Sequence, residues 1–455
     1  MTDSTATACT SVPHCTGQWL PVEKAVVDDW LQKHIEEIDG LVLDVPPRDD
    51  KDEPDVDYPL HPVVKGFKEA IEANPELSMF FHQMFAEIPE EEKGKSPQNY
   101  HQMLQLMSHV LTKAPEFSPK GITVSIPMFA ILRQPIVTKG GYAAFLNSTV
   151  NLHLKKILNA WGIFLKSPAS CYVLTADGWL SKQALEKFGG NFEKTFKCDP
   201  NKPHYGFTSW DNFFTRELQP DARPVADPGN KKVIANACES APLRVVKNIT
   251  KRSRFWIKGQ PYNLKFMLGD DPLTDKFVGG TVYQAFLSVF SYHRWHSPVD
   301  GKIVKAYVQD GTYYSDPLVE FKEGQDHPVT AVIDSQPYLS EMATRALIFI
   351  EADNPYIGLM CFMGIGMVDV STCDIKVYEG QRVKKGQETG MFHFGGSTHC
   401  LIFRPGVKLD FDFHGQTPGD KAKDIPINSK IATVPKDVEA QKQIQFEVQV
   451  AGFNM

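Results

Sequence analysis

The sequence lacks any long hydrophobic run. Across 455 residues, the longest apolar stretch covers only residues 356–368 and contains three glycines. A helix that spans a bilayer needs about 20 apolar residues, so this stretch predicts a buried pair of strands instead. The first ten residues also lack the basic start and apolar segment of a secretory signal. We therefore expect no stable membrane insertion and a cytoplasmic location.

Positive charge and cysteine motifs are also scarce. The chain has 48 Lys and Arg against 55 Asp and Glu, a formal net charge of −7. This balance predicts no nucleic-acid partner, because proteins that bind nucleic acids carry a basic surface patch. The 8 cysteines include no Cys-x-x-Cys pair, which favours reduced thiols over a zinc site or a disulfide framework. With 42% hydrophobic and 23% charged residues, the chain is typical of a globular protein with two or three domains.

The composition divides the chain into three parts. Residues 1–62 hold a polar tail, a short amphipathic helix over 28–39 and a linker dense in Asp and Pro. Residues 63–204 are rich in apolar residues at helical spacing and predict a helical domain. Residues 205–455 change to short β-branched and aromatic runs between turns, which predicts a β-rich domain.

Local signals predict individual elements. Ser96 before a proline is typical of a helix start, and longer helices are predicted over 142–165 and 208–218. Strands are predicted at 233–237, 243–246, 281–290, 301–308, 346–351, 375–378 and 401–403. We therefore expect an α+β fold, in which a helical N-terminal domain precedes sheets arranged as a barrel or a flattened sandwich.

Two segments carry most of the possible chemistry. The first is Phe394-Gly-Gly-Ser397, in which the Ser397 hydroxyl can attack the carbonyl of Gly396 through a five-membered ring. The two glycines remove the Cβ atoms that would hinder a strained peptide plane, and a nearby histidine could take the hydroxyl proton. Alone, Gly-Gly-Ser is more typical of an ordinary turn.

The second segment, Tyr292–His296, supplies His293 and His296. On a helix the two rings would share a face and could bind metal, but no third ligand with suitable spacing follows. In a strand or loop they point in different directions and can serve different tasks. Glu239 lies between two predicted strands, where a surface turn is the ordinary role. If it lies beside His296, it would orient the imidazole.

Four segments of the third part together resemble the phosphatidylserine decarboxylase family of pyruvoyl enzymes. They occur in the family's order and are 207–218 with 222–224, 257–264, 292–301 and 385–398. The resemblance extends to a fungal branch of that family which decarboxylates L-tryptophan. It implies that residues 205–455 form a pyruvoyl-dependent decarboxylase domain, which is completed by its own short C-terminal chain.

The resemblance also implies roles for single residues. Ser397 matches the nucleophile of self-cleavage at the Gly396–Ser397 bond and the precursor of the pyruvoyl group. His296 matches the base of the cleavage step, and His293 matches the histidine of the decarboxylation step. Glu239 stands where phospholipid-acting members carry the shorter aspartate of a triad.

The substrate pocket is predicted from proximity to these motifs. Trp295, Phe392 and Phe394 are candidates for its wall. His399 follows Ser397 by two residues and lies on the same face if the segment is a strand. The resemblance implies no role for His399, which either lines the pocket or packs in the core.

The expected function is decarboxylation of an aromatic L-amino acid, with L-tryptophan to tryptamine favoured, after autocatalytic serinolysis. The resemblance implies a pyruvoyl cofactor made from Ser397, with neither metal nor pyridoxal phosphate. The partners are then an amino-acid substrate and the enzyme's own two chains. One alternative is a phosphatidylserine decarboxylase that makes phosphatidylethanolamine. This alternative predicts a membrane anchor or a basic amphipathic helix. A second is a non-catalytic binding protein on the same scaffold, which predicts loss of Ser397 or a histidine.

Overall fold

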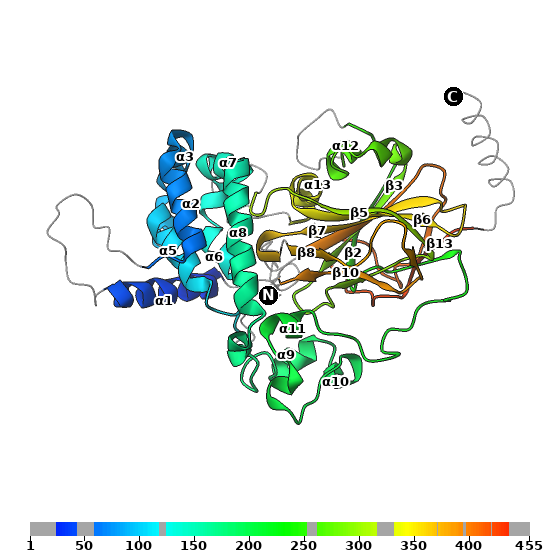
Figure 1. The fold of residues 1–455 in the computed structure, drawn as a ribbon, viewed down its shortest axis with the longest axis horizontal. Coiled ribbons are helices and arrows are strands. Elements are labelled where there is room, and N and C mark those ends of the chain that lie inside the picture. Colours follow the sequence, from blue (N-terminus) through cyan, green and yellow to red (C-terminus); the bar gives the residue numbers. More distant parts are fainter. Residues whose placement is uncertain are drawn as a thin grey trace, which may run out of the picture.

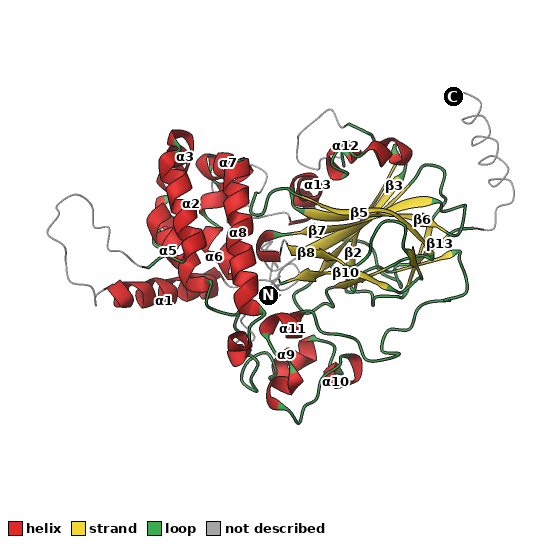
Figure 2. Cartoon of the chain, viewed as in Figure 1, coloured by secondary structure: helices red, strands yellow, loops and turns green. Residues whose placement is uncertain are grey.

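The computed structural model describes residues 24–42, 59–117, 124–252, 262–315, 332–370, 372–394, 397–419 and 421–435. Helices fill the N-terminal part of the chain, and the described strands of the C-terminal part form three antiparallel sheets (Figure 1; Figure 2). This arrangement confirms the expected α+β class. The predicted polar tail and most of the predicted linker lie outside the described residues.

Most helices of the N-terminal part begin at a side-chain cap, which satisfies backbone N–H groups that have no partner inside the helix. The helices are α1 (Lys24–Val42), α2 (Pro62–Ala73), α3 (Pro75–Ala86), α4 (Glu90–Lys93), α5 (Tyr100–Val110), α6 (Pro127–Leu132), α7 (Lys139–Leu146), α8 (Ser148–Leu165), α9 (Lys182–Lys187), α10 (Phe192–Thr195) and α11 (Trp210–Phe214). Two more, α12 (Leu264–Met267) and α13 (Val332–Met342), lie among the strands.

The predicted helices agree with the structure in part, and two of the differences come from side-chain caps. The helix predicted over 28–39 is confirmed and is longer, as α1. Asn99 rather than Ser96 caps α5. The helix predicted over 142–165 is two helices, because the Asn147 side chain caps a new helix, α8, directly after α7 ends. The helix predicted over 208–218 is reduced to the five residues of α11.

The strands of the described sheets pair antiparallel throughout. They are β1 (Val233–Ala235), β2 (Ala241–Lys247), β3 (Thr281–Leu287), β4 (Arg294–His296), β5 (Gly301–Gln309), β6 (Arg345–Ala352), β7 (Leu359–Gly366), β8 (Thr372–Ile375), β9 (Arg382–Val383), β10 (Glu388–His393), β11 (Ser397–Phe403), β12 (Asp410–Phe411) and β13 (Lys430–Thr433). Their orders are β2-β3-β11-β7-β6-β5-β9, β4-β10-β8 and β1-β13-β12. None of these sheets closes into a barrel. The stretch 356–368 forms one strand, β7, and not the predicted pair.

Strand β11 is an interior strand, the third of the seven-stranded sheet, and is buried along its whole length. It pairs with β3 on one side and with β7 on the other. Its residues alternate between two cores: Leu401 and Phe403 pack on one face, and Cys400 and Ile402 on the other. Because both faces are covered, all seven residues are buried and the strand shows no polar–apolar alternation.

The helical part is attached to the sheets by a buried carboxylate. Asp369, just after β7, accepts hydrogen bonds from the backbone N–H groups of Met128 (3.0 Å) and Phe129 (2.9 Å) at the start of α6. The Tyr314 hydroxyl also donates to it, at 2.9 Å. Burial raises the pKa of Asp369 to about 7. Among the described helices, none is long and apolar enough to cross a membrane.

Candidate active site

The segment that contains the predicted cleavage bond connects two sheets. Strand β10 belongs to the three-stranded sheet with β4, and β11 belongs to the seven-stranded sheet. The chain passes from one sheet to the other between His393 and Ser397. Gly395 and Gly396 lie outside the described residues. A break in this connection would leave every strand pairing of both sheets intact.

Ser397 is the first residue of β11 and is fully buried. Its neighbours across the sheet are Leu287 of β3 and Gly366 of β7. Within the described part of the chain, the Ser397 hydroxyl has no hydrogen-bond partner. Most buried hydroxyls are hydrogen-bonded, so the missing hydrogen bond of the Ser397 hydroxyl is unusual and is compatible with a reactive group.

His296 is the last residue of β4, and its ring is held by two hydrogen bonds. Asn428 donates from Nδ2 to the main-chain oxygen of Arg223 (3.0 Å) and accepts with Oδ1 at His296 Nδ1 (3.1 Å). Nδ1 therefore carries the proton. The lone pair is on Nε2, which accepts from the Tyr292 hydroxyl at 3.2 Å. In this tautomer Nε2 is the ring nitrogen that can accept a proton, and a histidine held by Asn in a Cys-His-Asn arrangement has the same orientation.

The surroundings of His296 keep its ring neutral. Burial lowers its pKa to about 4, the hydrogen bond that it donates to Asn428 opposes this shift, and the nearby positive charge of Arg294 adds to it. At neutral pH the imidazole is therefore neutral, and its Nε2 is able to take a proton.

Glu239 is bound by an arginine. Its carboxylate forms a bidentate pair with Arg223, with distances of 2.8 Å from Nε to Oε2 and 3.0 Å from Nη2 to Oε1. The side chains of Glu239 and Arg223 are only 13% and 20% exposed. The position predicted for Glu239, at His296 Nδ1, is occupied by Asn428. Glu239 therefore reaches the histidine only through Arg223, whose main-chain oxygen orients the Asn428 amide.

His293 lies just before β4 and is fully buried. Its ring stacks on Phe214 with a centroid distance of 4.1 Å and an angle of 22°. Its main-chain oxygen accepts from the N–H of Phe392, at 3.0 Å, and so joins β10. Burial lowers the pKa of His293 well below its ordinary value, and the positive charge of Arg216 lowers it further. Both histidines are therefore neutral, in separate surroundings.

Arg216 is a site residue that sequence reasoning did not single out. It is buried, and its Nη2 donates to the main-chain oxygens of Phe290 (2.7 Å) and Ser291 (2.9 Å). Its guanidinium lies over the rings of Phe188 and Phe196, at 4.6 and 4.3 Å from their centroids. Burial lowers its pKa to about 9. Arg216 thus holds the loop that leads into His293. The sequence signal that could have pointed to it is its position in segment 207–218, which resembles the family.

The predicted pocket aromatics divide between two cores. Trp295 and Phe392 pack edge to face, with centroids 4.7 Å apart, in the core between the sheets. Phe394 belongs to the core of the helical part, where it contacts Trp161 of α8 at 5.0 Å and Phe214 at 5.4 Å. The structure therefore brings Trp295 and Phe392 together and separates Phe394 from them.

His399 lies in the same core as Trp295. Its ring is stacked with Phe362 at 5.9 Å and meets the edge of Tyr283 at 6.0 Å. Neither ring nitrogen has a hydrogen-bond partner among the described residues. Burial lowers the pKa of His399 to about 3, so the ring is neutral.

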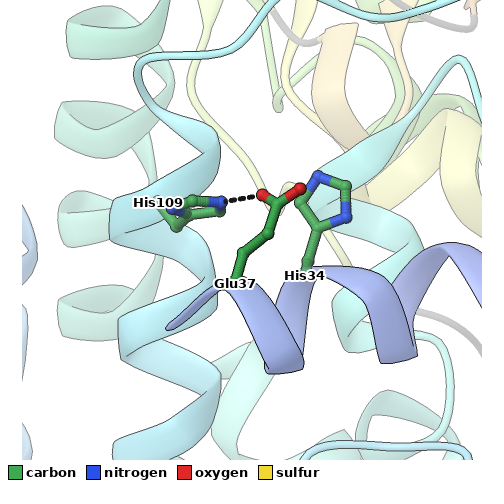
Figure 3. A group of neighbouring side chains, drawn as sticks. All are labelled: His34, Glu37 and His109. Atoms are coloured by element: carbon green, nitrogen blue, oxygen red, sulfur yellow. Dashed lines mark hydrogen bonds and ion pairs between the residues drawn. The ribbon is translucent and has the colours of Figure 1, made fainter. Parts of the chain in front are cut away.

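One group of side chains in the helical part has the residue types of a metal site. His34 and Glu37 of α1 and His109 of α5 bring their possible ligand atoms within 4.8 Å of one another (Figure 3). However, Glu37 Oε2 accepts from both His109 Nε2 (2.9 Å) and Lys113 Nζ (2.7 Å). The lysine already supplies the positive charge at this carboxylate, so the group is an ion-pair network that links α1 to α5.

Comparisons with known proteins agree with this site. Two family models match the chain, both described as phosphatidylserine decarboxylase, at residues 61–188 and 210–423. The chain therefore belongs to the phosphatidylserine decarboxylase family, and it is a carboxy-lyase. Ser397, His293, His296 and Glu239 all lie inside the second match, whereas Asn428 lies beyond its end.

The similar curated proteins are decarboxylases. Decarboxylase iboD of Amanita muscaria is 44% identical over 66% of this chain and 88% of its own length. L-tryptophan decarboxylase of Psilocybe cubensis is 36% identical over 83% of this chain and 88% of its own length. A phosphatidylserine decarboxylase proenzyme of Chlamydia felis is 30% identical over 52% of this chain and 75% of its own length.

Proposed function

We propose that this enzyme decarboxylates an aromatic L-amino acid, with L-tryptophan to tryptamine as the favoured reaction, by a pyruvoyl group made from Ser397. The observation that supports it most is the buried Ser397 hydroxyl, which has no hydrogen-bond partner among the described residues and lies at the connection between two sheets. Similarity to two proteins named L-tryptophan decarboxylase supports the substrate class. Relatives named proenzymes support processing of a precursor.

Cleavage uses residues of the chain alone. His296 Nε2 takes the Ser397 hydroxyl proton, the oxygen attacks the Gly396 carbonyl, and the proton passes to the Ser397 nitrogen as the Gly396–Ser397 amide bond breaks. The resulting ester loses the Gly396 carboxylate by elimination across Cα–Cβ of residue 397. Addition of one water then releases ammonia and leaves a pyruvoyl group on the chain 397–455. Asn428 contributes by holding the His296 ring in the tautomer whose Nε2 can accept a proton, and the Tyr292 hydroxyl gives up its bond to Nε2 as the Ser397 proton arrives.

The sheets would keep the two chains together after cleavage. Strand β11 of the short chain pairs along seven residues with both β3 and β7 of the long chain. Strand β13 pairs in the same way with β1. These ladders, with the cores on both faces of β11, make dissociation costly.

The residues around Ser397 fit a pyruvoyl group and its substrate. The group supplies a ketone that condenses with the substrate α-amine and accepts the electrons released as CO2 leaves. We assign His293 to proton delivery at the substrate α-carbon, because its buried ring is held on Phe214 beside β10. We assign Trp295, Phe392 and His399 to the substrate side of the site, whereas Phe394, which we also expected there, packs in the helical core. The site needs neither a metal nor pyridoxal phosphate for this chemistry.

The alternative substrate is phosphatidylserine, giving phosphatidylethanolamine. This alternative is favoured by the match to the phosphatidylserine decarboxylase family and by similarity to relatives such as the Chlamydia felis proenzyme. We place the protein in the cytoplasm, because the cysteines in the described residues are all free thiols. A non-catalytic binding role is not favoured, since Ser397 and both histidines are present in a chain of this family.

The test combines mass spectrometry with CO2 release. The wild-type protein should separate into two chains at Gly396–Ser397, and Ser397→Ala should remain one inactive chain. Ser340→Ala is the matched control, because Ser340 is a buried serine whose hydroxyl donates to the main-chain oxygen of Gln336. Two fragments from Ser397→Ala would refute the cleavage assignment.

The substrate is decided on the cleaved wild-type enzyme in buffer without detergent or added pyridoxal phosphate. We expect CO2 from tryptophan, and from tyrosine or phenylalanine at other rates. Turnover of phosphatidylserine vesicles without turnover of any aromatic amino acid would favour the lipid enzyme instead.

A further inference from the structure

The face of the seven-stranded sheet that carries Ser397 has a floor of small residues on its β7 side, where the rings of Phe362, Trp295 and Phe392 pack over Gly364, whereas Leu287 stands on the β3 side of Ser397. Two residues along β11, His399 lies on the same face, because side chains alternate along a strand. Its neighbours across the sheet are Ala285 of β3 and Gly364 of β7, and Ser397 has Gly366 on the β7 side. The His399 ring is therefore the large polar group that stands on this floor next to the reacting residue.

His399, Tyr283 and Trp295 in this core have buried polar atoms without partners among the described residues, as does Tyr356. Within the described part of the chain, both ring nitrogens of His399, the Tyr283 hydroxyl and Trp295 Nε1 make no hydrogen bond, and all three residues have zero exposure. They form one cluster, since the ring of Phe362 lies 5.9 Å from His399 and 5.3 Å from Trp295. Native proteins pair nearly all buried polar atoms. A cluster of this kind therefore indicates a binding partner with polar atoms of its own.

The position of the cluster matches the length of an amino-acid side chain. Residues 397 and 399 are separated by about 7 Å along an extended strand. A substrate held by its α-amine at residue 397 can therefore lay an aromatic ring over His399. Tyr283 is the next group along this face, paired across the sheet with Leu401. Its other neighbours are the half-buried rings of Phe411 and Phe413.

The cluster is also neutral. Burial lowers the pKa of His399 to about 3 and raises the pKa of Tyr283, so neither side chain is ionised at neutral pH. A neutral imidazole offers one N–H and one lone pair, and a phenol offers one donor and two acceptor sites. Such a pair suits a neutral group such as an indole N–H or a phenol hydroxyl, and it gives no charge to balance an anion.

We propose that Tyr283 and His399 are specificity-determining residues, which hydrogen-bond a polar atom on the ring of the substrate and so favour indole or phenol side chains over a plain phenyl ring. This inference rests on the proposed decarboxylation of aromatic amino acids. It adds Tyr283, and it gives His399 a recognition role rather than a packing role.

The first test is Tyr283→Phe, which removes only one hydroxyl. We expect kcat/KM for tryptophan to fall about tenfold or more, because a buried partner loses its hydrogen bond. For phenylalanine, kcat/KM should stay within about twofold of the wild type. His399→Leu should lower the tryptophan-to-phenylalanine ratio in the same direction. Tyr307→Phe is the matched control, since Tyr307 donates to Asp271 and packs in the core on the opposite face of the sheet.

Binding of indole and of toluene, measured by calorimetry on the cleaved enzyme, provides a readout without turnover. Tyr283→Phe should weaken indole about tenfold and leave toluene unchanged. Equal losses of affinity for both ligands and of kcat/KM for both substrates, or no loss of either, would overturn this inference. The proposed function would still stand, and buried water would then hydrogen-bond the polar atoms of the cluster. A cleaved wild-type enzyme that turns over no aromatic amino acid would overturn the proposed function and this inference together.

Discussion

Self-cleavage should continue at a pH where an ordinary histidine is protonated. His296 has its pKa lowered to about 4, chiefly by burial. At pH 5.5 a histidine with the usual pKa of about 6.5 is only about 9% neutral, whereas one with a pKa of about 4 is about 97% neutral. If neutral His296 is the base, the cleavage rate at pH 5.5 should nearly equal the rate at pH 7.5. The rate should fall only as the pH approaches 4.

Asn428→Asp should move this profile. The variant puts a carboxylate at the position where Asn428 Oδ1 meets His296 Nδ1, at 3.1 Å. A neighbouring opposite charge raises the pKa of an imidazole by about 1–3 units. For a rise of two units, the neutral fraction of His296 at pH 5.5 falls to about 24%. Cleavage by the variant at pH 5.5 should therefore be about fourfold slower than at pH 7.5, and the wild type should show no such difference.

The assay needs newly made precursor. A radiolabelled chain from a short cell-free synthesis is shifted into buffers between pH 4.5 and 8, and the loss of the single chain is followed on gels. His296→Asn is the control, and it should not cleave at any pH. A wild-type rate that drops about tenfold between pH 7.5 and 5.5 would show that the base titrates like an ordinary histidine. That result would refute the argument from burial.

Three further predictions follow from the same contacts. His293→Ala should still form two chains but should lose about 10²–10⁴ in kcat for CO2 release; if it blocks cleavage and His296→Ala does not, the two roles are reversed. Glu239→Gln should slow cleavage without stopping it, because Glu239 acts only through Arg223, and an uncleaved Glu239→Gln chain on gels would contradict this indirect role. Asp369 has a folded-state pKa near 7, above its unfolded value, so it binds its proton more tightly when folded. Its contribution to stability should thus fall as pH rises from 5 to 7, by about 1.4 kcal/mol per unit, and urea unfolding of Asp369→Asn should lack that slope.

The reactive segment was predicted from two motifs taken together and from the family resemblance, because Gly-Gly-Ser alone is more typical of a turn. Ser397 follows two glycines and can attack the preceding carbonyl, and the two histidines lie within five residues of one another. The α+β class was also predictable, because apolar residues at helical spacing give way to β-branched runs after residue 205. The segments that resemble the family, 207–218 with 222–224, 257–264, 292–301 and 385–398, lie almost entirely inside the second matched region.

Element boundaries were less predictable, because they depend on single caps and on burial from both sides. Asn147 ends one helix and starts the next, although the apolar spacing continues across it. The stretch 356–368 was predicted as two strands, since an uninterrupted apolar run shows no period of two. Strand β7 is one strand that is covered on both faces.

Only the tertiary structure decided which polar atoms meet. Asn428 orients His296 from 132 positions away in the chain, and no spacing rule connects two such residues. Glu239 was the nearer candidate by pattern, yet Arg223 binds its carboxylate. The Tyr283 hydroxyl and the His399 ring share a core only because β3 and β11 pair in one register. Side-chain chemistry is set by the sequence, but a hydrogen bond also requires two atoms within about 3 Å, and strand order and register bring them there.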